Sequence, residues 1–157
     1  MKKIAIFVDV QNIYYTCRDT YQRQFNYREL WQVISMQGDI VLANAYAIDR
    51  DDPKQHKFQS ALKHLGFNVK LKPYIQRKDG SAKGDWDVGI TIDILETAAS
   101  VDTVILLSGD GDFAMLLDSI NHKYTIKTEV YGVKKLTANS LIQSADIFHC
   151  IESDLLL

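Results

Sequence analysis

The amino-acid sequence predicts a three-layer α/β fold, in which a mainly parallel central sheet is covered by helices on both faces. Short apolar runs rich in β-branched residues, such as Thr103–Leu107, are typical of strands buried on both faces. These runs alternate with helical patterns along the chain, and such alternation favours parallel strands connected by helices. No internal repeat, low-complexity tract or break in composition interrupts the alternation. We therefore expect a single domain over residues 1–157.

Each predicted element follows from its local pattern. The expected strands are apolar stretches, and in chain order they are Lys3–Val8, Asp39–Ile48, Phe67–Tyr74, Thr103–Leu107, Thr125–Tyr131 and a further candidate at Ile147–Ile151. The expected helices lie between them, at Tyr27–Met36, Pro53–Leu65, Trp86–Ala99, Phe113–Asn121 and Thr137–Ser144. Pro53 suits the first turn of its helix, and Gly66 suits a C-terminal cap. The polar, tyrosine-rich stretch Asn12–Phe25 shows no clear pattern.

Composition and charge narrow the class of protein. The 157 residues are 46% hydrophobic and 24% charged and include only two prolines, which excludes a disordered chain. A formal net charge of -2 gives no global attraction for nucleic acid, so such binding would need a local basic surface. The two cysteines form no CxxC pattern and indicate a reducing compartment. Because no signal peptide or membrane-spanning segment is recognisable, we expect a soluble cytoplasmic protein with no membrane partner.

Carboxylates stand at the ends of two predicted strands. Asp9 directly follows the first strand, and Asp110 and Asp112 flank Gly111 shortly after the fourth. The glycine lets the backbone turn sharply and approach other groups closely, so both acids can project from one strand-to-helix turn. Asp87 stands at the start of a predicted helix. In a sheet of this kind, sites form beyond the carboxyl ends of the strands, where these acids are expected. The alternative is that each acid simply caps a helix.

If these four aspartates converge, their mutual repulsion must raise some pKa values or be neutralised by a cation. The available ligands are all oxygens, because the Asn12 amide and the Ser108 hydroxyl join the carboxylates. Such a set suits Mg²⁺ or Mn²⁺, whereas zinc prefers histidine or cysteine. One or two such ions can polarise a phosphodiester and activate a water as the attacking group. Asn12 could instead cap the helix that follows it.

A basic loop precedes Asp87. Arg77, Lys78 and Lys83 could draw a phosphate backbone towards the acids, and Trp86 could stack on a base. The alternatives are an ordinary solvated loop and a tryptophan that packs in the core. With Ser108, these residues are the expected substrate contacts.

Four short blocks occur in order between about Ile4 and Ile151. They are Asp9-Val-Gln-Asn12, then Lys83-Gly84 with Asp87 and Asp93, then Ser108-Gly-Asp-Gly-Asp-Phe113, and last Ser140-Leu141 with Ala145-Asp146 and Phe148. In these blocks the chain resembles the NYN domain family of PIN-like ribonucleases, in particular its bacterial LabA-like branch. Two positions depart from the family pattern, because Asp85-Trp86 places Lys83 one residue further from Asp87, and Met115 stands where many relatives have proline.

The resemblance implies a Rossmann-like, PIN-like sheet in the strand order 3-2-1-4-5. It also implies Mg²⁺- or Mn²⁺-dependent cleavage of RNA by Asp9, Asp87, Asp110 and Asp112, with Asn12 orienting water or phosphate. The second hypothesis is a binding module of the same fold that contacts RNA or protein with little or no turnover. A third, phosphoryl transfer through an aspartate, is disfavoured because Gln11 stands where such enzymes have a second acid.

Three further features carry smaller expectations. Asp93 is expected on a face of its helix away from Asp87, and Asp146 in a turn before the last strand. The apolar tail Asp154–Leu157 is expected to pack on the core or on a partner, which leaves a homodimer open.

Overall fold

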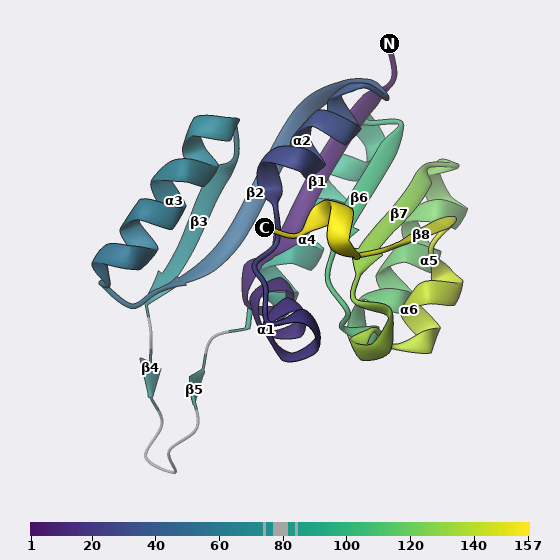
Figure 1. Cartoon of the computed structure of the whole chain (residues 1–157). Helices are drawn as coiled ribbons and strands as arrows, with labels where there is room; N and C mark the ends of the chain where they lie inside the picture. The colour runs from purple at the N-terminus through teal and green to yellow at the C-terminus, as the bar shows by residue number, and fades with distance from the viewer. Residues whose placement is uncertain (74, 77–81, 84) are drawn as a thin grey trace.

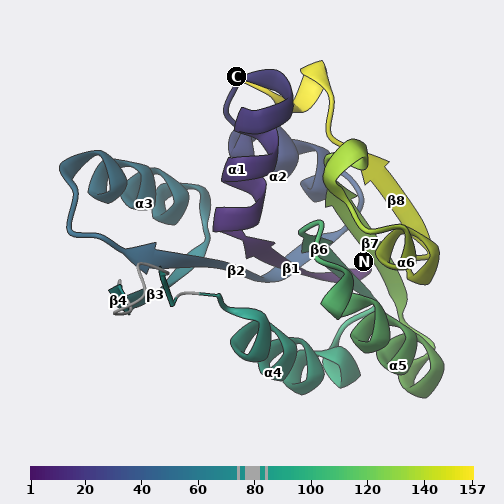
Figure 2. The same ribbon diagram turned by 90° about the horizontal axis from the view of Figure 1, so that it is seen from below.

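A six-stranded parallel sheet forms the centre of the fold, and helices cover both of its faces (Figures 1 and 2). This computed structural model describes residues 1–73, 75–76, 82–83 and 85–157. The strands lie in the order β3-β2-β1-β6-β7-β8. Their bounds are β1 Lys3–Asp9, β2 Asp39–Asp49, β3 Asn68–Pro73, β6 Thr103–Leu107, β7 Lys127–Gly132 and β8 Ile147–Cys150. Counted along the chain, this order is 3-2-1-4-5-6, so the expected order is confirmed and β8 extends it by one strand.

The central strands β1 and β6 are buried on both faces. In β1, Ile6 and Val8 belong to one hydrophobic core, while Phe7 belongs to the core on the opposite face. All five residues of β6 are buried. Neighbouring side chains on a strand point to opposite faces, so a strand between two layers of helices must be apolar at nearly every position. This burial explains why the two runs were recognisable from the sequence.

The two cores are closed by different sets of helices. On one face lie α1 (Val10–Tyr21), α2 (Tyr27–Ser35) and α3 (Pro53–Leu65), and on the other lie α4 (Asp87–Thr97), α5 (Ala114–Tyr124) and α6 (Asn139–Ser144) (Figure 2). Short 3₁₀ turns occur at Ala98–Ser100, Gly111–Phe113, Lys134–Leu136 and Ser153–Leu155. Pro53 occupies the first turn of α3, and Gly66 ends that helix with φ 124°, as expected.

Two elements differ from the sequence-based expectation. The polar stretch without a clear pattern contains most of α1, whose buried residues are only Val10, Ile13 and Cys17. A stripe this narrow leaves most of the helix polar, and a polar helix has a weak periodic signal. The segment expected to be a loop after β3 contains a short antiparallel pair, β4 (Ile75–Gln76) and β5 (Ala82–Lys83), that extends away from the sheet (Figure 1). Tyr74, expected at the end of β3, lies outside the described residues.

The carboxyl-terminal tail packs on its own chain. Leu155 and Leu156 are buried in the core beneath α1 and α2. The backbone of the tail is paired with the connection between those helices, because Asn26 N–H donates to the Leu155 carbonyl at 2.8 Å and Phe25 forms a bridge with Leu156. The buried part of the tail therefore needs no second copy to cover it. Within the part of the chain that the structure describes, no helix is both long and apolar enough to cross a membrane.

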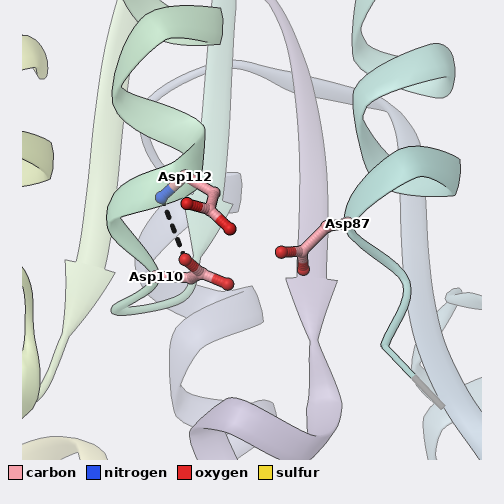
Figure 3. Close-up of side chains that lie close together, drawn as sticks. All are labelled: Asp87, Asp110 and Asp112. Carbon is pink, nitrogen blue, oxygen red and sulfur yellow. Dashed lines mark hydrogen bonds between the residues drawn. The ribbon is translucent and has the colours of Figure 1, made fainter. Parts of the chain in front are cut away.

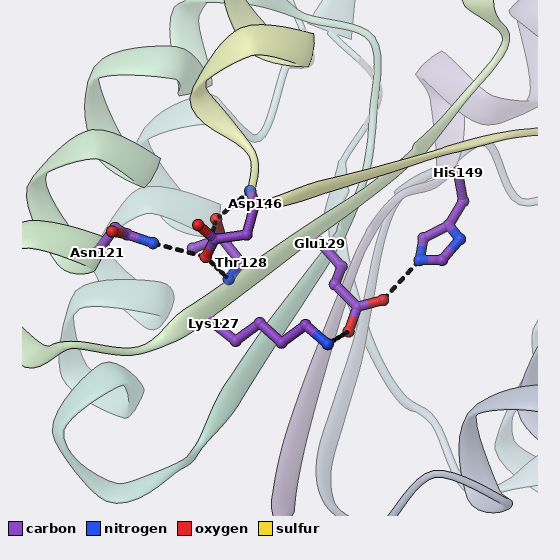
Figure 4. A network of polar contacts seen from close by, with 6 residues as sticks. All are labelled: Asn121, Lys127, Thr128, Glu129, Asp146 and His149. Atoms are coloured by element: carbon purple, nitrogen blue, oxygen red, sulfur yellow. Dashed lines mark hydrogen bonds and ion pairs between the residues drawn. The ribbon is translucent and has the colours of Figure 1, made fainter.

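Polar side chains hold β8 beside β7 (Figure 4). The Asp146 carboxylate accepts from Thr128 N–H at 2.8 Å and from the Asn121 amide at 2.6 Å, so this acid organises the turn before the last strand, as expected. On the opposite face, the buried Glu129 carboxylate contacts His149 Nε2 at 2.5 Å and Lys127 Nζ at 3.8 Å. The hydrogen bond with His149 holds the pKa of Glu129 below its usual range. Polar side-chain contacts thus stabilise the pairing of β7 with β8 on both faces of the sheet.

The buried tail leads to a test of stability. Leu156→Ala should lower the free energy of unfolding by about 2 kcal/mol, because it leaves a gap in the core. This loss corresponds to a fall of ~5 °C in the melting temperature measured by calorimetry. Leu157→Ala is the matched control, since Leu157 is 65% exposed whereas Leu156 is 5% exposed. Equal melting temperatures for the two variants would show that the tail does not pack as described.

Candidate metal centre

Pairing between β1 and β6 brings two acidic loops together. The two strands are parallel and in register, with Val8 beside Leu107. Asp9 ends β1, and Asp110 follows β6 after only Ser108 and Gly109. Because both strands end at the same edge of the sheet, the side chains that follow them share one region. The sheet topology therefore brings these carboxylates together from positions about a hundred residues apart in the sequence.

Two glycines allow the β6 loop to lie against the loop that precedes α6. A Cβ atom on Gly109 would lie 2.6 Å from the Leu136 carbonyl oxygen, and one on Gly111 would lie 2.9 Å from the Ala138 Cβ. Both distances are too short for a side chain to be accommodated without movement. The Gly109 carbonyl also accepts from Ala138 N–H at 3.0 Å. Gly109 and Gly111 are thus required for close approach of the backbone.

Ser108 and Asn12 connect the two strand ends. The Ser108 hydroxyl is fully buried, donates to Asp9 Oδ2 at 3.1 Å and accepts from Asp110 N–H at 3.2 Å. Asn12 Oδ1 accepts from Gly109 N–H at 2.9 Å. The Asn12 side chain therefore connects α1 to the β6 loop and does not cap α1. Both residues hold the acidic loops in place, while their expected contacts with substrate, water or phosphate stay predictions.

Three of the four expected acids converge (Figure 3). Asp87, Asp110 and Asp112 each offer a carboxylate oxygen, and these oxygens all lie within 4.8 Å of one another. Asp87 comes from the first turn of α4, whereas Asp110 and Asp112 come from the turn between β6 and α5. Asp9 is not a member of this group, so the structure does not confirm a centre of four carboxylates. One Asp9 oxygen instead accepts a hydrogen bond from the Ser108 hydroxyl.

The two acidic turns share one local arrangement. Asp110 Oδ1 accepts from Asp112 N–H at 2.9 Å, and Asp85 Oδ1 accepts from Asp87 N–H at 3.2 Å. In each Asp-x-Asp segment the first carboxylate fixes the second residue through this bond, and at Asp110 the bond also caps a 3₁₀ turn. The capping alternative is therefore correct for one oxygen of Asp110, and the other oxygen still faces the group. Sequence reasoning missed Asp85, although the repeat of the Asp-x-Asp pattern could have revealed it.

The pKa values of two acids reflect the crowding of negative charge. Burial raises the pKa of Asp87 to about 7, and the neighbouring carboxylates of Asp110 and Asp9 add to the rise. Burial likewise raises the pKa of Asp9 to about 6, although the hydrogen bond from Ser108 opposes this effect. The charges of Asp110 and Asp85 raise it further. Asp9 therefore belongs to the same electrostatic site as the three converging acids, without sharing their close contact.

The three converging acids could hold a hard divalent cation. Two oxygens bound to one Mg²⁺ at about 2.1 Å are at most about 4.2 Å apart. The observed limit of 4.8 Å requires only a small movement of a side chain to reach that spacing. The donors are carboxylate oxygens, the ligand type that Mg²⁺ and Mn²⁺ prefer. The chemistry and spacing of the group therefore fit such an ion.

Trp86 is partly buried and packs against the hydrophobic core beneath α4 and α5. Its Nε1–H donates to the Ala47 carbonyl at 2.9 Å, and its ring lies 5.3 Å from that of Tyr46. Lys72 Nζ lies 4.4 Å from the ring centroid, and a Cβ atom on Gly89 would lie 2.6 Å from the ring. These contacts match the core alternative for Trp86, and stacking on a base stays a prediction.

The remaining basic residues cannot be placed around the centre. Arg77 and Lys78 lie outside the described residues, and for Lys83 only the backbone, in β5, is described. Their contacts with substrate stay predictions. The side chain of Lys72 lies beside the start of α4, where its Nζ donates to the Asp85 carbonyl at 3.1 Å.

Asp93 lies away from the centre, as expected from its position on α4. Its Oδ2 accepts from the Tyr46 hydroxyl and from Lys70 Nζ, each at 2.7 Å. Tyr46 in turn packs against Trp86, one residue before Asp87. These bonds connect the middle of α4 to β2 and β3, and the contact between Tyr46 and Trp86 holds the start of the helix next to Asp87.

Comparison with known proteins supplies the family. A model of the NYN domain matches residues 3–152, nearly the whole chain. The chain belongs to the NYN domain family. The protein LabA ("Low amplitude and bright protein") of Synechococcus elongatus is 30% identical over 136 residues, which cover 82% of this chain and 73% of LabA. The expected resemblance to the LabA-like branch is thereby confirmed.

Solved structures support the same fold for this NYN domain. A crystal structure of a Vibrio parahaemolyticus protein of unknown function is 56% identical, with a TM-score of 0.94 over 99% of this chain and 96% of that one. A ribokinase from Giardia lamblia is 11% identical, with a TM-score of 0.51 over 94% of this chain and 57% of that one. At such low identity, the ribokinase shows only a shared α/β architecture.

The raised pKa of Asp87 leads to a test of charge crowding in the metal-free protein. Its value of about 7 in the fold compares with 3.8 for an ordinary carboxyl. Between these values the folded state binds more protons than the unfolded state, so stability falls as the pH rises. Asp87→Asn should therefore raise the melting temperature near pH 8 and change it little near pH 4. Because Asp87 is partly exposed, we expect a gain of only about 1 kcal/mol after solvent screening.

The control for this test is Glu96→Gln, which removes a negative charge from the exposed face of the same helix. It should leave the difference between the two pH values unchanged. If Asp87→Asn instead lowers the melting temperature equally at both pH values, the charge of Asp87 is not held unfavourably in the fold.

Proposed function

We propose that this NYN domain is a ribonuclease that hydrolyses RNA phosphodiester bonds with the help of Mg²⁺ or Mn²⁺. The convergence of Asp87, Asp110 and Asp112 carries the proposal, because two separate strand-to-helix connections deliver these acids to one point. A helix cap needs one carboxylate, so capping does not account for three that converge at the edge of the sheet. The raised pKa values of Asp87 and Asp9 fit a site that a cation would neutralise.

In this proposal, Asp87, Asp110 and Asp112 hold the metal ion. When bound, the ion supplies positive charge that polarises the phosphodiester and stabilises the leaving oxygen. Asp110 keeps one oxygen on the Asp112 amide and directs the other to the centre (Figure 3). The backbone of the β6 loop is thus fixed by the same residue that binds the ion.

Asp9 takes a different role from the other three acids. Ser108 occupies its Oδ2, and its pKa of about 6 leaves the carboxylate largely ionised at neutral pH yet basic enough to accept a proton. We assign Asp9 as the residue that takes a proton from the attacking water. The water oxygen then bonds to phosphorus as the bond from phosphorus to the leaving oxygen breaks, and the leaving oxygen is protonated from solvent. Ser108 and Asn12 act as positioning residues, since both hold the loop that bears Asp110.

RNA is the substrate class that the family membership supports. The resemblance on the aspartate blocks implies cleavage of RNA, and the cations of the preceding loop, Arg77, Lys78 and Lys83, are the proposed contacts to its phosphates. The location of this basic sequence directly before Asp87 supports an approach of the RNA backbone from that side. Trp86 then contributes by fixing α4 through its contact with Ala47.

The decisive test compares Asp110→Asn with the unaltered protein on labelled RNA in Mg²⁺ and in Mn²⁺. Asparagine keeps an oxygen to accept from Asp112 N–H, so the loop should keep its shape. Loss of a ligand charge should slow cleavage by at least about 100-fold, since even residues behind the ligands are worth 10- to 100-fold. Asp118→Asn is the control, because Asp118 is an exposed aspartate on α5. A chelator should stop cleavage by the unaltered protein and by Asp118→Asn.

Two results would contradict the proposal. Undiminished metal-dependent cleavage by Asp110→Asn would place the activity elsewhere or in a contaminant. Binding of RNA or protein by the unaltered chain, with no cleavage in either metal, would favour the alternative of a binding module.

A further inference from the structure

A cavity of about 480 Å³ is lined by residues of α1 and α3. These two helices lie on the face of the sheet opposite α4 and α5 (Figure 2). Its apolar walls include Ile13, Phe25 and Phe58, and Ala47 and Ile48 of β2 also line it. Pockets of roughly 300–1,000 Å³ with apolar walls and a few polar groups are typical of small-molecule and nucleotide sites. None of the functional residues assigned above lines this cavity.

Two mostly buried residues in the wall present polar atoms to the cavity. Gln59 is 6% exposed and Tyr27 is 8% exposed, and both line the cavity. Among the described residues, no hydrogen-bond partner reaches the Gln59 amide or the Tyr27 hydroxyl. No side-chain nitrogen or oxygen in the described residues is both shielded from solvent and without a partner, so the polar atoms of Gln59 and Tyr27 are open to water in the cavity. A ligand with a polar edge could replace that water. Burial keeps the pKa of Tyr27 far above its usual value, so its hydroxyl can both donate and accept.

The rim of the cavity carries aromatic rings and cations. Tyr14 is 48% exposed and Tyr15 is 37% exposed. The Arg18 guanidinium lies 5.6 Å from the Tyr14 ring centroid and 4.7 Å from that of Tyr15, and it also pairs with Asp19 at 3.1 Å. Lys54 lies across the opening on α3. Nucleic-acid sites combine the same elements, with rings for bases and cations for phosphates.

The cavity lies next to Asp9, at the edge of the sheet where β1 ends. Val10 and Gln11 line it, and they directly follow Asp9 at the end of β1. The wall residues Ala47 and Ile48 come from the carboxyl end of β2, the strand that pairs with β1. A strand of RNA that approaches Asp9 could therefore also reach the cavity.

We infer that this cavity is a nucleobase pocket that receives one unstacked base of single-stranded RNA. The Gln59 amide and the Tyr27 hydroxyl would pair with the edge of the base, since amide side chains offer a donor and an acceptor side by side. Tyr14 would stack on the neighbouring base, and Arg18 and Lys54 would contact the phosphates on either side. The inference rests on the proposed function for the identity of the polymer, and it adds a base preference and a binding site outside the metal centre.

Measuring RNA binding under conditions that prevent cleavage tests the pocket independently of the metal centre. We would measure fluorescence anisotropy with homopolymeric A, C and U RNAs of about 12 nucleotides, in chelator, with Asp110→Asn as the parent protein. The parent should bind one homopolymer more tightly than the others. Adding Gln59→Leu should reduce that preference by about tenfold, because each good base contact is worth about 1–3 kcal/mol and leucine offers no hydrogen bond. Its melting temperature should not fall, since the variant removes a buried polar group that has no protein partner.

A second variant tests the phosphate contact. Arg18→Ala should weaken binding to all three homopolymers alike and lower the salt dependence by about one phosphate contact. Lys123→Ala is the matched control, because Lys123 also lies over a tyrosine, with Nζ 5.2 Å from the Tyr124 centroid, but at the end of α5 away from the cavity. It should bind like the parent.

The outcomes separate this inference from the proposed function. If the parent binds RNA and Gln59→Leu and Arg18→Ala bind like Lys123→Ala, the nucleobase pocket is wrong while the ribonuclease proposal stands. If the parent binds no RNA at any salt concentration, both the RNA assignment and the pocket fail. Equal binding of all three homopolymers by the parent would overturn the role of Gln59 and Tyr27 in reading a base edge.

Discussion

The pairing of β1 with β6 is the constraint on which the rest of the site depends. The two strands are buried on both faces, so their register is determined by packing against helices on each side. That register places Asp9 next to the β6 loop and allows Ser108 to connect the two strand ends. A slip of one residue would reverse the faces of the apolar side chains, and the stability of the core therefore also fixes the geometry of the acids.

The fold holds its negative charges together at a cost in stability. Hydrogen bonds from Ser108 and from the Asp112 amide stabilise individual carboxylates, yet the pKa values of Asp9 and Asp87 remain well above the ordinary range. A surface under selection for stability alone would spread these acids apart. Functional sites commonly retain such unfavourable arrangements because a ligand relieves them. The Tyr46–Asp93–Lys70 network shows the opposite arrangement on another face of α4, where Asp93 Oδ2 accepts from both a hydroxyl and a cation of the protein.

The sequence reveals those features that depend on local patterns. Strands β1 and β6 are continuous apolar runs, and the acidic turn after β6 is visible as Asp110-Gly111-Asp112. Helix α1 escaped prediction because only three of its residues are buried, and the short β4–β5 pair has no recognisable alternation. The role of Gly109 depends on the Leu136 carbonyl, and the bond from Gly109 to Asn12 spans 97 residues. Contacts of this range leave no local signal, so neither the separation of Asp9 from the other acids nor the cavity beside α1 could be derived from the sequence.

The central claim is that Asp87, Asp110 and Asp112 bind one divalent cation. Anomalous diffraction from crystals soaked in Mn²⁺ tests this claim most directly, because it locates the ion without assuming an activity. The account predicts an anomalous peak bound to an oxygen of each of the three carboxylates, at a distance of about 2.1–2.3 Å. Ordered crystals that show no peak there, or a peak only at surface acids such as Asp118, would contradict it.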